Sequence, residues 1–170
     1  MDSERLIARL EANVAIARGL IESAAPEQIA WKPDPEAWSI LEVAAHLLDE
    51  EREDFRVRLG LLLEDPESDW PPIDPEGWVT ARSYATWNPM ETLMSWLDER
   101  VASVRWLRSL TAPNWENAKT HPRGWTVSAG DMLAAWAMHD VLHARQLVRL
   151  HWAYLQHLSR PHATDYAGEW

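Results

Sequence analysis

Three histidines have the residue type and the spacing of a metal site. His139 and His143 stand four residues apart in the segment HDVLH. On a helix this spacing places both imidazoles on one face, one turn apart, where they can share one divalent cation. His46, far away in the sequence, could supply a third nitrogen ligand from a facing helix. Such a three-nitrogen site leaves coordination positions for water or substrate.

Local signals mark the two helices of the first half of the chain. Ser3 can cap a helix over residues 4–24, whose apolar residues recur every three or four positions. Ser39 and Glu42 form a Ser-x-x-Glu capping box. This box predicts a second helix over residues 40–63, which would carry His46.

The second half of the chain predicts two further helices. The dipeptide Asn88-Pro89 supplies an N-cap and a proline at the first helical position, so a third helix should follow and end near residue 110. Thr126 or Ser128 can cap a fourth helix that ends near residue 159 and carries the other two histidines.

The predicted elements together indicate the fold class. Four long amphipathic helices in 170 residues predict an all-α four-helix bundle, formed as a single domain over residues 1–170. Residues 64–88 hold four prolines and predict a long connection between the second and third helices. Residues 111–127 form a loop of medium length, and residues 160–170 a tail.

His139 and His143 share one face of the predicted fourth helix with apolar residues. The other members of this face are Met132, Trp136, Leu147, Leu150 and Tyr154. Both imidazoles therefore face the core, where burial costs free energy unless each is hydrogen-bonded or coordinated. Two hydrogen-bonded core histidines are the alternative, but an inward pair with this spacing favours a metal.

His46 lies at the edge of the apolar face of the second helix, which suits a ligand at the mouth of a cleft or a solvated histidine. Glu50, one turn later, could orient a ligand or a bound water. The acidic residues around it predict a solvated face: Glu51, Glu53 and Asp54. The remaining histidines are expected at the surface: His121, His151, His157 and His162.

Two other metal chemistries fit the sequence poorly. The segment HDVLH is similar to the His-Glu-x-x-His motif of zinc proteases, in which the carboxylate is the general base. Asp140 is one methylene shorter, and no third ligand stands at the usual downstream spacing. A di-iron bundle needs Glu-x-x-His on two helices, and the sequence has no Glu-x-x-His.

Composition disfavours several partners. The net charge is −11, so nucleic acids and anionic membranes would be repelled. No apolar run is long enough to cross a bilayer. Cysteine is absent, which removes disulfides, thiolate ligands and a cysteine nucleophile and fits a cytoplasmic protein.

The 12 tryptophans, against one phenylalanine, indicate either a tryptophan-rich core or a tryptophan-lined cleft.

Two segments together resemble the DinB/YfiT-like metalloprotein superfamily. WSILEVAAHL, residues 38–47, is similar to the start of the family's second helix, where a histidine follows a Trp-Ser-x-x-Glu cap. His139-x-x-x-His143-x-x-Gln146, preceded by the sequence GWTV, is similar to its fourth-helix motif. The order of the segments and the four-helix layout also match, so the resemblance covers nearly the whole chain.

The resemblance implies that His46, His139 and His143 bind one divalent metal, zinc or nickel. It also implies a long crossover connection between helices two and three, and a homodimer. Characterised relatives include enzymes that use low-molecular-weight bacterial thiols, and metal-dependent hydrolases. We therefore expect a thiol-dependent S-transferase acting on a small molecule. A metal-dependent hydrolase and a non-catalytic, metal-stabilised binding protein are the alternatives.

Further residues are candidates for supporting roles around the predicted metal. Glu50 and Gln146 could lie behind the ligands, and Gln146 occupies a position that the family motif shares. Arg123, Arg145 and Arg149 could hold a substrate carboxylate. Trp136 could line the substrate site.

Overall fold

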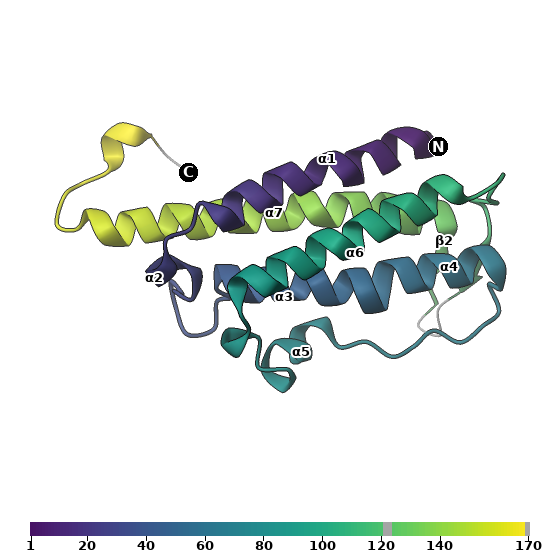
Figure 1. Cartoon of the computed structure of the whole chain (residues 1–170), viewed down its shortest axis with the longest axis horizontal. Helices are drawn as coiled ribbons and strands as arrows, with labels where there is room; N and C mark the ends of the chain where they lie inside the picture. The colour runs from purple at the N-terminus through teal and green to yellow at the C-terminus, as the bar shows by residue number, and fades with distance from the viewer. Residues whose placement is uncertain (121–123, 169–170) are drawn as a thin grey trace.

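The computed structural model describes residues 1–120 and 124–168, which form a bundle of four long helices (Figure 1). These are α1 (Ser3–Glu22), α3 (Ile40–Glu50) with its continuation α4 (Arg56–Glu64), α6 (Pro89–Ser109) and α7 (Ala129–Ser159). A π-helical turn, η1 (Glu51–Phe55), joins α3 and α4 into one continuous helix. The predicted all-α four-helix bundle is confirmed.

The α3–α4 helix and α6 run in the same direction, because a long crossover connection returns the chain between them (Figure 1). This connection carries the short helix α5 (Pro75–Ala81) and the 3-10 turn η2 (Tyr84–Thr86). The other short elements are α2 (Pro26–Ile29), β1 (Ala118–Thr120), β2 (Thr126–Ser128) and the 3-10 turn η3 (Asp165–Ala167). β1 and β2 pair in an antiparallel hairpin where the sequence predicted a loop.

The bundle helices begin at side-chain caps, most of them predicted. Ser39 and Glu42 form the expected capping box of α3, and the side chain of Asn88 caps α6. Ser128, rather than Thr126, caps α7. The predicted cap Ser3 is wrong, because Asp2 instead accepts the hydrogen bond from the first turn of α1. A carboxylate does this more favourably at the positive end of the helix dipole.

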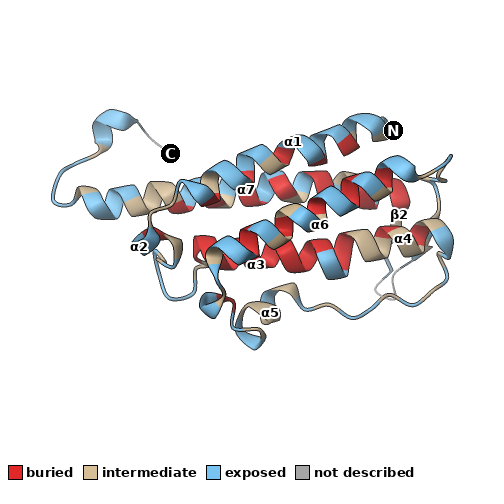
Figure 2. Cartoon of the chain, in the orientation of Figure 1, coloured by how far each residue is buried: buried red, intermediate tan, exposed pale blue. Residues whose placement is uncertain are grey.

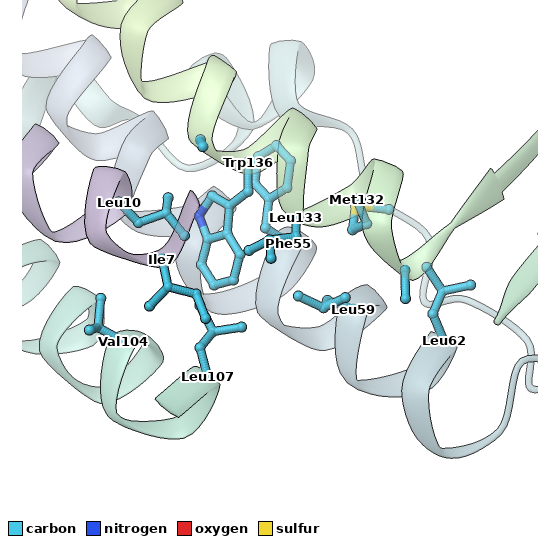
Figure 3. Packing of buried hydrophobic residues seen from close by; sticks show 12 residues of the cluster. Ile7, Leu10, Phe55, Leu59, Leu62, Val104, Leu107, Met132, Leu133 and Trp136 are labelled. Atoms are coloured by element: carbon cyan, nitrogen blue, oxygen red, sulfur yellow. The ribbon is translucent and has the colours of Figure 1, made fainter. Parts of the chain in front are cut away.

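Two apolar clusters fill the bundle. The cluster in Figure 3 lies around the π-helical turn and α4, and it includes Leu10, Phe55, Leu59 and Trp136. The second cluster lies at the α3 end, and it includes Ile21, Leu47, Trp96 and Leu147. In α6, Val101 is 57% exposed, although its apolar spacing with Leu97 and Val104 favours an inward position. Its place on the buried face is taken by an arginine, Arg100.

Every residue of α3 is buried (Figure 2). The helix contacts α6 and α7 within the bundle, and α5 and η2 of the crossover connection cover it from outside. Asp49 there accepts hydrogen bonds from Arg82 and Tyr84 of the connection. The expected edge position of His46 is wrong, because its ring is buried against Trp38 and the two histidines of α7.

In the acidic run that follows α3, Glu51 and Asp54 are also buried, so the predicted solvated face is wrong at both residues. Glu51 accepts hydrogen bonds from Arg100 Nε at 2.9 Å and Nη2 at 2.8 Å, and from the Trp136 indole at 3.1 Å. Arg100 also donates to Asp140. One guanidinium thus pairs with two buried carboxylates and ties η1, α6 and α7 together.

No helix of residues 1–120 and 124–168 is long and apolar enough to cross a membrane.

Candidate metal centre

The structure brings His46 of α3 together with His139 and His143 of α7. His139 Nε2 lies 3.4 Å from His46 Nε2 and 3.0 Å from His143 Nε2. One nitrogen from each ring lies within 4.8 Å of the other two. Because α3 and α7 pack side by side at this level, residues 93 positions apart in the sequence form one cluster.

The spacing of these nitrogens fits a bound cation. Metal–nitrogen bonds of about 2.0–2.1 Å place neighbouring ligands about 3.4 Å apart in a tetrahedron and about 3.0 Å apart at octahedral angles. The two measured separations correspond to these values. A neutral imidazole carries a single N–H, so His139 Nε2 cannot donate to both neighbours. A shared cation satisfies all three lone pairs at once.

The protonation states of the rings also fit metal binding. Burial, reinforced by the charge of His143, lowers the pKa of His46 to about 3. Burial lowers the pKa of His139 and of His143 as well, and nearby cationic groups lower that of His139 further. All three rings are therefore neutral near pH 7, and a neutral imidazole is the form that binds a metal.

Gln146 sets the tautomer of one ring. Its Oε1 lies 2.7 Å from His143 Nδ1, so this ring nitrogen donates its hydrogen and Nε2 keeps a free lone pair. His46 Nδ1 is buried without a hydrogen-bond partner among the described residues. Trp38 lies against the cluster, with its ring centroid 4.9 Å from that of His46. Gln146 thus lies directly behind one of the three histidines.

Glu50 is placed differently from its expected role. It is buried beside Asp54, and no described interaction joins it to a histidine. Burial, reinforced by the charge of Asp54, raises the pKa of Glu50 to about 8. The pair therefore holds a proton at neutral pH. Asp140, which a protease mechanism would use as the base, is instead paired with Arg100.

A cleft of about 700 Å³ opens beside the histidine cluster. One wall is α7, with His143, Gln146, Arg145 and Arg149, and the other is the segment 33–38, which ends at Trp38. Substrate could therefore approach the histidines from this side. The arginine candidates at positions 145 and 149 line the cleft.

One other candidate does not line the cleft. Trp136 is 1% exposed, packs against Phe55 in the core and donates to Glu51, so its predicted role at the substrate site is wrong (Figure 3). The pattern that placed it on the histidine face also marks core positions. Arg123 lies outside the described residues.

Sequence reasoning missed two residues that shape the site. In the sequence, Trp38 belongs to a helix-start motif, yet in the structure its ring covers two of the histidines. Arg100 is the second, and an arginine on the buried face of α6 is the signal of a buried ion pair. His151, expected at the surface, is partly buried, with Nε2 2.7 Å from the Leu20 carbonyl oxygen.

Comparisons with known proteins agree with this fold. The sequence profile of the DinB superfamily matches residues 9–147. No curated protein matches the chain. Among solved structures, YfiT from Bacillus subtilis is described as a probable metal-dependent hydrolase with an unusual four-helix bundle topology. It is similar with a TM-score of 0.77 and 20% identity, over 87% of this chain and 85% of YfiT.

A second solved structure is the mycothiol-dependent maleylpyruvate isomerase. Its TM-score is 0.68 and its identity 14%, over 86% of this chain. The present chain spans 61% of the length of that isomerase. At these identities the two structures share the fold with this chain.

Proposed function

The chain belongs to the DinB superfamily, and we propose that it is a divalent-metal-dependent enzyme that transfers the sulfur of a low-molecular-weight thiol. The observation that carries the proposal is the convergence of three neutral imidazoles beside an open cleft. The metal is zinc or nickel, because imidazole suits both and the nitrogen spacing accommodates a tetrahedral or an octahedral ion.

Three neutral ligands leave the full positive charge of a bound divalent ion, which would favour the thiolate form of a thiol or the hydroxide form of water. A free thiol has a pKa of about 8.5, whereas that of water is 15.7, so much less stabilisation is needed to ionise the thiol. No carboxylate of the described residues joins the three histidines in this cluster. Thiol chemistry needs no such base.

In the proposed transfer, the thiol loses its proton to solvent and its sulfur forms a bond to an electrophilic carbon of a second small molecule. The bond from that carbon to its leaving group breaks, and the leaving group departs with the electron pair. Gln146 would hold His143 in the tautomer that keeps Nε2 free. Trp38 would cover the histidines and limit the access of water.

Metal-dependent hydrolysis is the second candidate. It is supported by the likeness to YfiT, which is described as a probable metal-dependent hydrolase. A third reading is a closed, non-catalytic site that only fastens α3 to α7. Because the cleft reaches His143, we favour an open site over this one.

Cobalt substitution distinguishes these readings, since sulfur coordination to cobalt gives an intense charge-transfer band. The chain has no cysteine, so any such band must come from added thiol. We expect the band with a low-molecular-weight bacterial thiol, and its loss in His46→Ala. His157→Ala, which removes an exposed histidine of α7, is the matched control and should keep the band. Water exchange without a sulfur band would favour hydrolysis, and a site inert to both would indicate a structural metal.

We further propose that the protein is a cytoplasmic homodimer. Apolar side chains repeat every seven residues on the exposed side of α7, at Val141, Val148 and Leu155. This is the spacing of a helix that packs against a second helix. Sedimentation analysis should give twice the chain mass, and Val148→Glu should give the monomer; a monomeric native protein would contradict the proposal.

A further inference from the structure

Two arginines line the cleft without an ionic partner. Arg145 and Arg149 stand four residues apart on α7, so their side chains lie on one edge of the helix. In the described part of the chain, neither makes an ion pair or a hydrogen bond, whereas Arg56, Arg58, Arg82 and Arg100 all do. The cleft therefore presents two unpaired guanidinium groups.

The arginines lie at a defined distance from the histidine cluster. His143 and Arg149 are separated by six residues, which corresponds to about 9 Å along the helix axis. Gln146 lines the cleft between them. A ligand that reaches both the histidines and Arg149 must therefore be elongated, with its reacting end and its charged end well apart.

The opposite wall limits the charge of this ligand. It carries Asp34 and Glu36, and Asp34 Oδ1 is already bound to the backbone N–H groups of residues 36 and 37. The negative charges of these two acids repel a multiply charged anion such as a phosphate. A single carboxylate meets less repulsion, and its two oxygens match the planar fork of an arginine.

We propose that Arg145 and Arg149 form a carboxylate subsite, so that the substrate thiol is an elongated molecule with its carboxylate remote from its sulfur. This inference rests on the proposed thiol chemistry. It makes the edge of α7 the part of the cleft that selects among thiols. The arginines are exposed, so their preference for an acid should be modest and should weaken at high salt.

The test compares 8-mercaptooctanoate with 8-mercaptooctanol on the cobalt-substituted protein, with binding read from the sulfur charge-transfer band. The acid should bind about three- to tenfold more tightly than the alcohol at low salt. The double variant Arg145→Gln, Arg149→Gln should lose this preference but still bind both thiols. The control Arg9→Gln, Arg105→Gln removes the same charge from exposed residues outside the cleft and should keep it.

The outcomes separate the two proposals. Equal binding of acid and alcohol, or a preference that survives in the cleft double variant, would overturn the carboxylate subsite alone. A preference lost equally in the control would show a general charge effect and would also overturn it. No sulfur band with either thiol would overturn the proposed thiol chemistry, and the subsite with it.

Discussion

Arg100 of α6 donates through Nη2 to Asp140 at 2.9 Å, and Asp140 directly follows His139 on α7. The same guanidinium is bound to Glu51 in the π-helical turn that follows α3. The helix that carries His46 and the helix that carries His139 are thus fixed to one buried cation. The ionic network in the core thereby sets the relative position of the histidines.

Replacing Arg100 by methionine should destabilise the fold strongly. The change leaves Glu51 and Asp140 as buried carboxylates without their cation, and the loss of one partner of a buried ion pair costs about 3–5 kcal/mol. Denaturant unfolding at constant metal saturation measures this loss. The matched variant Arg108→Met breaks an exposed ion pair with Glu11 and should cost less than about 1 kcal/mol. Equal losses in the two variants would show that the network contributes no more than a surface pair.

Gln146 should control metal affinity without binding the metal. Gln146→Leu removes the acceptor that fixes the His143 tautomer, so affinity should fall about 10- to 100-fold. Gln146→Glu keeps an acceptor at this place and should retain most of the affinity. Competition with a chromogenic chelator gives the constants. Unchanged affinity in Gln146→Leu would mean that the hydrogen bond does not hold the ring.

Glu50→Gln should stabilise the protein in a pH-dependent way. The folded pKa of Glu50 is raised to about 8 from an ordinary 4.5, so its proton stabilises the fold below pH 4.5 and this contribution is lost as the pH rises to 8. The amide of glutamine stays neutral at every pH, so the variant does not lose this stability as the pH rises. At pH 8.5 we therefore expect the free energy of unfolding of the variant to exceed that of the native chain by at least about 1 kcal/mol. At pH 4.5 the two free energies, measured by denaturant unfolding, should differ little. The same gain at both pH values would show that Glu50 is not protonated in the fold.

Metal removal should weaken the fold without unfolding it. A bound ion stabilises the native state by mass action, so chelation should lower the melting temperature by several degrees. Two apolar clusters hold the bundle independently of the histidines, and the helical circular-dichroism spectrum should persist. A random-coil spectrum after chelation would show that the fold depends on the metal.

The elements of the fold were largely predictable because their signals are local. The box of Ser39 and Glu42 and the cap at Asn88 placed the starts of two bundle helices correctly. The pairing of His139 and His143 on one face follows from helix geometry alone. The chain's helical layout is therefore encoded in short segments.

The burial of polar groups was not predictable, since it depends on contacts distant in sequence. Glu51 has the pattern of a solvated face, but its ion pair with Arg100 of α6 places it in the core. Trp136 fits the stripe of the histidines equally well as a core residue or as a cleft residue, and only the packing of α7 on η1 decides. The cleft itself forms between α7 and the loop of residues 33–38. No pattern in that loop indicates that it lines a cleft.

The most direct test of the account is the metal content of protein purified without an affinity tag. Elemental analysis should find about one divalent ion per chain, zinc or nickel. His143→Ala should lose this ion, because two remaining imidazoles hold it poorly, while His157→Ala should keep it. Metal-free native protein that takes up no added zinc or nickel, or full occupancy in folded His143→Ala, would contradict the assignment of His46, His139 and His143 as the metal ligands.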